Sequence, residues 1–241
     1  MRWAALALAG LALTGCETSA EKSATLEKAA LARLRSSPAA KGRLRIARPS
    51  SVLKVLSSAV VRDSEGIAAV VTLHNESDSA LQAVPLQIAV HGAGGSTLYT
   101  NTSSGIASSL ATVSYIAAHG TTTWVDDQVQ ATGAPTSVTA EAGEGQRAVG
   151  GAPQIELRRG EVTQEAGGTE VKGTAVNRSA VTQTELVVYA VSMRGGRTVA
   201  AGRAVVPELA AGASASFSIL LIGAAPGDSR LSLSAPPTTL R

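Results

Sequence analysis

The strongest constraint on the fold of this chain is an alternation of apolar and polar residues that occurs twice, about 100 residues apart. Residues 71–75 and 86–91 alternate in the first copy, and residues 171–177 and 187–193 alternate in the second. A period of two predicts strands with one buried face. The second strand of each copy runs into glycines, which predicts a turn after it. The chain therefore reads as a domain-sized duplication of antiparallel strands.

Short motifs recur with the same spacing as the strands. Asn75-Glu76-Ser77 corresponds to Asn177-Arg178-Ser179, and residues 119–124 correspond to residues 211–217 with a shift of one position. An Asn at the end of a strand can bond to nearby main chain and stabilise a turn. Asn75, Asn101 and Asn177 also fit the glycosylation pattern Asn-x-Ser. We expect a turn-capping role for them rather than glycosylation.

Composition favours the same fold class. Aromatic residues make up 2% of the chain, there are 24 glycines, and small or β-branched residues dominate. Such residues suit strands and turns more than helices. We predict an all-β protein with two tandem immunoglobulin-like β-sandwiches, residues 50–141 and 154–241, joined by a glycine-rich linker at residues 142–153.

The order of strands and motifs resembles bacterial immunoglobulin-like domains of the FxLYD type. Residues 171–222 carry the best match, and Val188-Tyr189-Ala190 stands where that family has Leu-Tyr-Asp, so only the tyrosine is kept. Residues 100–118 add Ser, Thr and Ala to the first copy. The resemblance implies an exported or membrane-bound accessory or binding module without catalysis.

The first 16 residues indicate export. Arg2 precedes an apolar run from Trp3 to Leu13, which is shorter than the roughly 20 residues that span a bilayer. Leu13, Thr14, Gly15 and Cys16 resemble the bacterial lipobox. The resemblance implies that residues 1–15 are a signal peptide and that Cys16, the only cysteine, receives lipid such as palmitate. A single cysteine also excludes a disulfide framework within the chain.

The segment after the cysteine is predicted to be a tether over residues 16–49. Residues 17–37 have a possible helix start and an irregular apolar pattern, which Pro38 ends, so the tether is flexible or partly helical. Glu17 follows the lipidated position and favours the outer membrane in an organism that has two membranes. We expect the protein in the bacterial cell envelope, outside the cytoplasm.

Charge is strongly segregated along the chain. Nine basic residues and no acid lie between Lys28 and Arg62, and eight acids with no Lys or Arg lie between Asp63 and Glu144. Seven of the basic residues form a candidate binding site for an anionic lipid or envelope polymer: Lys28, Arg33, Arg35, Lys41, Arg43, Arg45 and Arg48. The alternative is a solvated spacer. Nucleic acid is not expected, because no aromatic residues interleave with the charges.

No residue pattern indicates catalysis, a metal or a cofactor. His74, His91 and His119 are expected to be separate surface residues, and Gly92–Gly95 lacks the Lys and helix of a phosphate-binding loop. Asp126-Asp127 is expected on a solvated strand or loop. The sequence therefore favours a non-enzymatic envelope lipoprotein that binds an unidentified envelope protein or polymer. An envelope hydrolase, or an accessory subunit of an envelope enzyme, is the alternative.

Overall fold

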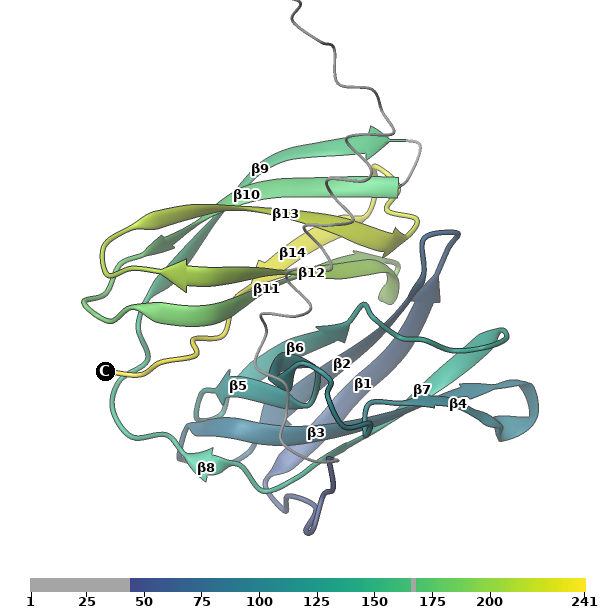
Figure 1. Cartoon of the computed structure of the whole chain (residues 1–241), viewed down its shortest axis with the longest axis horizontal. Coiled ribbons are helices and arrows are strands. Elements are labelled where there is room, and N and C mark those ends of the chain that lie inside the picture. Colours follow the sequence, from purple (N-terminus) through teal and green to yellow (C-terminus); the bar gives the residue numbers. More distant parts are fainter. Residues whose placement is uncertain (1–43, 166–167) are drawn as a thin grey trace, which may run out of the picture. The chain divides into compact units, whose positions relative to one another are not determined.

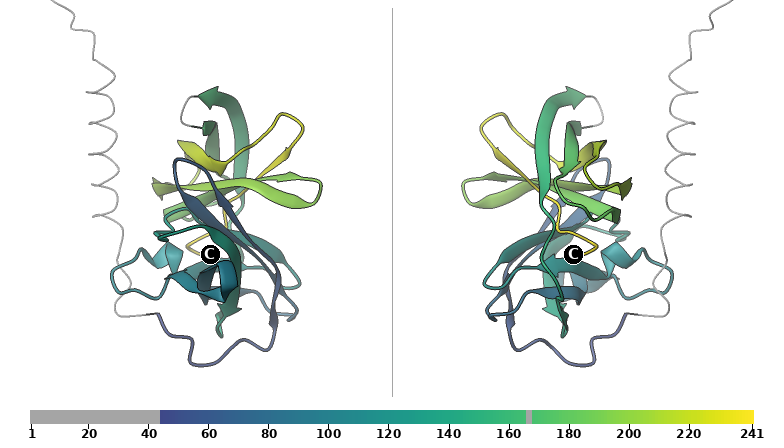
Figure 2. Two further views of the ribbon diagram at one scale, coloured as in Figure 1. Left: turned by 90° about the vertical axis from the view of Figure 1, so that its right-hand side faces the viewer. Right: turned by 90° about the vertical axis from the view of Figure 1, so that its left-hand side faces the viewer.

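The computed structural model describes residues 44–165 and 168–241, and these residues form an all-β structure, as the sequence predicts (Figures 1 and 2). Apart from strands they contain two single turns of 3-10 helix, η1 (Ala93–Gly95) and η2 (Ser108–Leu110). No helix among the described residues is long and apolar enough to cross a membrane. The predicted helix or stalk of residues 17–37 lies outside the described residues.

The first half (residues 44–148) consists of two antiparallel sheets. One has the order β1-β2-β6, and in the other β3 pairs with β4, β5, β7 and β8. The strands are β1 (Leu53–Arg62), β2 (Ile67–Asn75), β3 (Leu81–Gly92), β4 (Thr97–Thr100), β5 (Thr112–Ile116), β6 (Thr121–Asp126), β7 (Pro135–Ala142) and β8 (Gln146–Arg147). The predicted turn at Gly92–Gly95 connects β3 to β4, and its Gly94 and Gly95 have positive φ.

The second half (residues 149–241) repeats this arrangement with the strand order β14-β11-β12-β13-β10-β9. Its strands are β9 (Ile155–Glu165), β10 (Gly168–Asn177), β11 (Gln183–Arg194), β12 (Arg197–Leu209), β13 (Ser214–Gly223) and β14 (Arg230–Ser234). Strands β9, β10 and β13 correspond to β1, β2 and β6, and β11 corresponds to β3. A short pairing of β12 with β13 joins the two groups of strands into one order.

Equivalent hydrogen bonds occur in the two halves. Asn75 Nδ2 donates to the Ser79 carbonyl at 2.8 Å, and Asn177 Nδ2 donates to the Val181 carbonyl at 2.8 Å. In both motifs the asparagine Oδ1 accepts bonds from the main-chain N and the hydroxyl of the serine two residues later. Both asparagines are fully buried, as is Asn101, whose side chain bonds to main chain of three residues. The turn-capping interpretation is therefore confirmed for Asn75 and Asn177, whereas Asn101 bonds to the main chain of β3 and of Leu110.

The alignment of the turns before β6 and β13 is corrected by one residue. His119 N donates to the Ser77 carbonyl at 3.2 Å, and Gly212 N donates to the Ser179 carbonyl at the same distance. Both residues have positive φ, 52° and 71°. His119 therefore corresponds to Gly212, and residues 119–124 align with residues 212–217 without a gap.

In this alignment Trp124 in the first half corresponds to Phe217 in the second half. Trp124 pairs with Val71 across β6 and β2, and Phe217 pairs with Gly173 across β13 and β10. A Cβ on Gly173 would collide with the Phe217 ring and would lie 2.7 Å from the Arg158 carbonyl. Gly173 therefore has no side chain because the ring and a neighbouring strand occupy that space.

Ion pairs at one end of the sheets show the same equivalence with reversed charges. Lys54 on β1 pairs with Glu76 after β2, whereas Glu156 on β9 pairs with Arg178 after β10 at 2.8 Å. In each half the residue after the shared asparagine thus pairs with the second residue of the adjacent strand.

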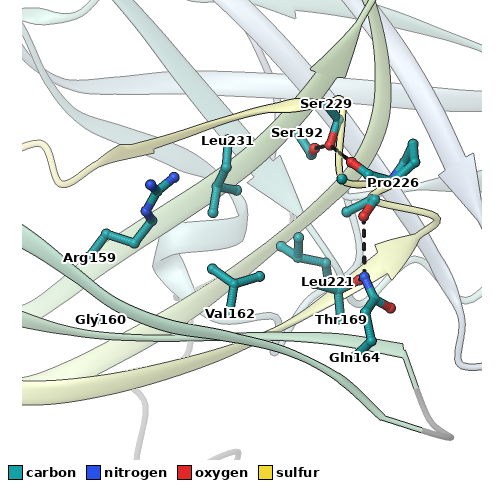
Figure 3. A pocket seen from close by; sticks show the side chains of 12 residues that line it. Arg159, Gly160, Val162, Gln164, Thr169, Ser192, Leu221, Pro226, Ser229 and Leu231 are labelled. Atoms are coloured by element: carbon teal, nitrogen blue, oxygen red, sulfur yellow. Dashed lines mark hydrogen bonds between the residues drawn. The ribbon is translucent and has the colours of Figure 1, made fainter.

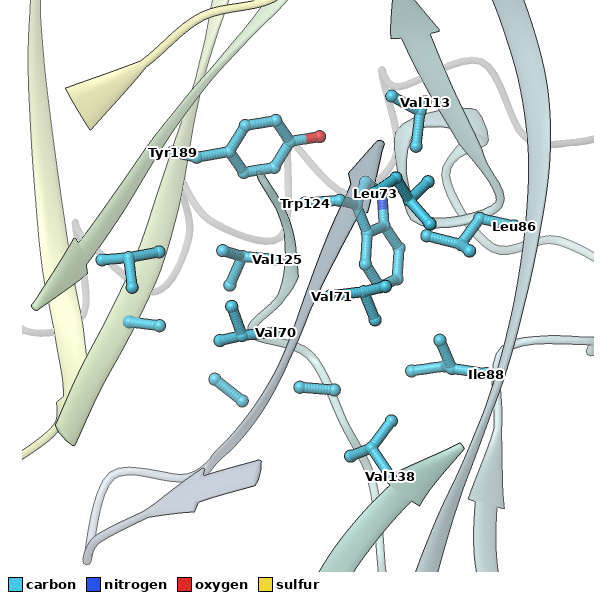
Figure 4. Close-up of a cluster of buried hydrophobic side chains, with 14 of the residues drawn as sticks. Val70, Val71, Leu73, Leu86, Ile88, Val113, Trp124, Val125, Val138 and Tyr189 are labelled. Carbon is cyan, nitrogen blue, oxygen red and sulfur yellow. The ribbon is translucent and has the colours of Figure 1, made fainter. Parts of the chain in front are cut away.

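One hydrophobic core extends across both halves. Val70 and Val125 on the β1-β2-β6 sheet pack with Val187, Tyr189 and Val191 on β11 (Figure 4). The opposite side of that sheet packs on β3, so β2 is buried on both faces over residues 68–71. Strand β11 is also buried on both faces, with Leu186, Val188 and Ala190 in a second cluster. The sequence predicted a half-buried β11, and the continuous apolar run of residues 186–191 is the feature that distinguishes a strand buried on both sides.

The segment predicted to be a linker belongs in part to the first half. Residues 146–147 form β8, which pairs with Leu81 and Gln82, and Gly143 N donates to the Pro85 carbonyl at 2.8 Å. The connection between the halves is therefore shorter than residues 142–153. Strand pairing along β3 gives the main chain of this glycine-rich stretch its hydrogen-bond partners.

Candidate functional site

Most of the residues that the sequence assigns to function lie outside the described part of the chain. These are the lipobox residues Leu13, Thr14, Gly15 and Cys16, and five residues of the basic tether: Lys28, Arg33, Arg35, Lys41 and Arg43. Arg45 and Arg48 are described, and both are exposed. They lie just before Pro49, which forms an isolated bridge with Gly143, and Ser50 N donates to the Ala142 carbonyl at 2.8 Å. The end of the tether thus lies along the end of β7.

The three histidines have separate partners. His74 bonds to Thr121 at 3.1 Å, His91 to Thr139 at 2.9 Å, and His119 to Asp78 at 2.8 Å. Strands β2 and β3, which carry the first two, belong to different sheets. Among the described residues, no three His, Cys, Asp or Glu side chains are grouped so as to hold a metal ion.

The adjacent acids Asp126 and Asp127 form a buried junction between the halves, which corrects the expectation that they are solvated. Arg203 on β12 donates from Nε to Asp127 Oδ1 at 3.0 Å and from its main-chain N to Oδ2 at 3.1 Å. It also donates from Nη1 to the Ser109 hydroxyl at 2.9 Å. The side chains are 4% exposed for Arg203 and 17% for Asp127.

Asp126 is fully buried beside this ion pair. The Tyr99 hydroxyl donates to its Oδ2 at 2.9 Å, and Gln128 N donates to its Oδ1 at 2.9 Å. Burial raises the pKa of Asp126 to about 6, although both hydrogen bonds oppose the shift. Burial, and then the negative charge of Asp126, raise the pKa of Tyr99. A fully buried carboxyl is inaccessible to a substrate, so the arrangement indicates a structural role.

The alternation of residues along β6 could have predicted that Asp126 is buried. Thr122, Trp124 and Asp126 alternate on one face of β6, so Asp126 has the same orientation as the buried tryptophan. Its counterpart in the second half is Ile219, a fully buried residue that pairs with Val171 as Asp126 pairs with Ala69. Arg203 gave no such signal, because its partner is remote in sequence.

A groove of about 400 Å³ lies in the second half between β9 and β14 (Figure 3). We call it the β9–β14 groove, and its principal lining residues are Arg159, Val162, Gln164, Leu221, Ser229 and Leu231. Gln164 Nε2 donates to Thr169 Oγ1 at 2.7 Å and to the Ala225 carbonyl at 3.2 Å. At the opposite wall the Ser192 hydroxyl donates to the Ser229 hydroxyl at 2.6 Å, which donates to the Pro226 carbonyl. The lining combines an apolar floor with polar groups that are already bonded to one another.

No protein-family model matches the chain, and no curated protein is significantly similar to it.

Proposed function

We propose that this chain is an exported lipoprotein, anchored in the cell envelope through lipid on Cys16, whose β domain is a non-catalytic binding module. The observation that carries the proposal is the sequence Leu13-Thr14-Gly15-Cys16 at the end of a short apolar run with one preceding positive charge. The resemblance of residues 171–222 to FxLYD-type immunoglobulin-like domains supports the binding role. The tight junction between the halves supports a module that presents its surfaces in a fixed arrangement.

Metabolic labelling with a fatty-acid analogue tests the anchor. The wild-type chain should take up label and remain with membranes after cell lysis. Cys16→Ser should lose the label, because its hydroxyl does not form the thioether to diacylglycerol. Ser19→Ala, a small change three residues away, should be labelled as the wild type is. Equal labelling of the wild type and Cys16→Ser would rule out the lipoprotein function.

The basic tether is proposed to hold anionic lipid or polymer near the anchor. Charges of this kind near a membrane surface contribute about 1 kcal/mol each, and their effect declines over a Debye length of about 8 Å at physiological salt. The mature chain from Glu17 should therefore sediment with anionic vesicles at low salt and be released as salt rises. A chain in which Lys28, Arg33, Arg35, Lys41, Arg43, Arg45 and Arg48 are all replaced by Gln should remain in solution. Failure of the unmodified chain to bind at low salt would leave the solvated spacer as the role of the tether.

A further inference from the structure

The β9–β14 groove lies between two strands whose equivalents in the first half, β1 and β7, are joined by a hydrogen bond. Gly173 and Val71 are equivalent, and they pair with Arg159 on β9 and Ser58 on β1. In the first half Ser58 Oγ donates to the Val138 carbonyl on β7 at 2.6 Å, which ties β1 to β7. In the second half the longer arginine takes the place of Ser58. The direct link between the two strands is therefore missing there.

The other side of the groove follows the same correspondence. Ala83 on β3 and Glu185 on β11 both have positive φ, so we take them as equivalent positions. Val90 and Ser192 each lie seven residues further along their strands and are therefore equivalent too. Val138 pairs with Val90, and Leu231 pairs with Ser192. Arg159 and Leu231 on the groove therefore occupy the positions of Ser58 and Val138, the two residues that close the first half.

The edges of β9 and β14 that face the groove have main-chain groups that could pair with a strand of a partner. Strand β9 pairs with β10 alone and β14 with β11 alone among the described strands, so the sides that face the groove belong to no ladder. Unpaired edges accept an added strand, and alternate side chains of that strand then enter pockets beside it. Val162, Leu221 and Leu231 form such an apolar floor, and Val162 is 45% exposed.

The charge of Arg159 indicates that a partner bound in the groove would be negatively charged. Arg159 lines the groove, and no acidic side chain in the described residues lies within ion-pair distance of it. Its neighbour Arg158, by contrast, pairs with Glu156 at 2.6 Å. A carboxylate brought by a partner would find an unopposed guanidinium at the groove, with planar donors suited to two parallel hydrogen bonds.

We propose that the β9–β14 groove binds an extended acidic peptide segment by strand addition, with apolar side chains on the floor and a carboxylate on Arg159. This inference rests on the proposed binding function and names the class of its partner. Strand addition explains why the free edges, the apolar floor and the unpaired cation occur together. The counterpart in the first half also has unpaired strand edges, but the hydrogen bond from Ser58 to β7 closes it.

Fluorescence polarisation with the mature chain from Glu17 tests the proposal independently of lipidation. The probes are dye-labelled heptapeptides in which Val or Leu alternates with Thr, and one Thr is replaced by Glu or, in the matched set, by Lys. The Glu set should bind at least about tenfold more tightly than the Lys set. Methylation of alternate backbone nitrogens in the Glu set should abolish binding, because the added strand then cannot donate to the edge.

Variants of groove residues test whether the peptides bind in the groove. Arg159→Glu should reverse the preference to the Lys set, and Arg159→Ser, which restores the residue of the first half, should remove the preference. Arg147→Glu makes the same change of charge on β8 of the first half and should leave binding unchanged. Leu231→Lys should abolish binding of both sets, and a circular dichroism spectrum like the wild type's shows that it folds.

Three results would overturn the inference. They are binding without a preference for Glu, a preference that persists in Arg159→Glu, and no binding of either peptide set. None of these results bears on labelling of Cys16, so the anchor and the groove are judged separately.

Discussion

Asp127 accepts hydrogen bonds from both the side chain and the main chain of Arg203, a residue on β12 that lies 76 positions away in sequence. Removing one partner of a buried ion pair leaves the other charge unpaired, which costs about 3–5 kcal/mol. We expect Arg203→Met to lower the free energy of unfolding by that amount in urea titrations.

A double-mutant cycle separates the pair from its surroundings. The combination of Arg203→Met with Asp127→Leu should cost less than the sum of the two single changes, since no charge is then left unpaired. Lys54→Ala removes an exposed pair and serves as the control, with an expected loss of at most about 1 kcal/mol. Additive effects at Asp127 and Arg203 would show that the pair contributes little to the junction.

Asp126 should make stability depend on pH in a defined window. Its pKa in the folded chain, about 6, lies above the ordinary value of 3.8, so the folded state retains a proton that the unfolded state releases. The corresponding stability is fully present below about pH 4 and is lost as pH rises to about 6. Asp126→Asn keeps acceptor and donor groups for Gln128 and Tyr99 but does not titrate.

Thermal unfolding between pH 4 and 7 measures this effect. The wild type should lose stability relative to Asp126→Asn across the window, by a difference on the order of 2–3 kcal/mol. His119→Gln, which alters an exposed pair, should leave the wild-type slope between pH 4 and 6 intact. Parallel curves for the wild type and Asp126→Asn would contradict the assignment.

Gly173 should not tolerate a side chain, although its counterpart is Val71. A methyl group there would meet both the Phe217 ring and the main chain of Arg158, so one of them must move. Overpacking of this kind costs about 1–3 kcal/mol, and Gly173→Ala should lower the melting temperature accordingly. Gly151→Ala is the control, because a Cβ at that position has no atom within 4 Å. A melting temperature equal to the wild type's would mean that the Phe217 ring moves without cost.

The two halves should unfold together. Val187, Tyr189 and Val191 pack on the first half, so residues 154–241 alone would expose them to water. Trp124 is the single tryptophan of residues 17–241, and its fluorescence reports on the first half, whereas circular dichroism reports on all strands. We expect coincident denaturant transitions from the two signals. Two separated transitions would show that the halves are independent domains.

The sequence predicted the parts of the fold that depend on local pattern. Alternation located β2, β3 and β10, and the repeated asparagines marked equivalent turns. The junction was missed for a physical reason: the acidity of Asp126 and Asp127 suggested solvent, and burial depended on Arg203 and Tyr99, which tertiary contacts alone bring near. The groove was missed because it results from differences between the copies, such as Arg159 for Ser58 and Leu231 for Val138, whose effects depend on strands not adjacent in sequence.

The reversed ion pairs, Lys54 with Glu76 and Glu156 with Arg178, bear on how a chain with two similar halves avoids folding one half with strands of the other. Tandem copies with the same strand order are prone to such exchange. If β1 took the place of β9, Lys54 would face Arg178, and the displaced Glu156 would face Glu76. Each exchange brings like charges together, whereas the native pairing brings opposite charges together. The charge reversal thus favours pairing of each strand within its own half over exchange with the equivalent strand of the other half.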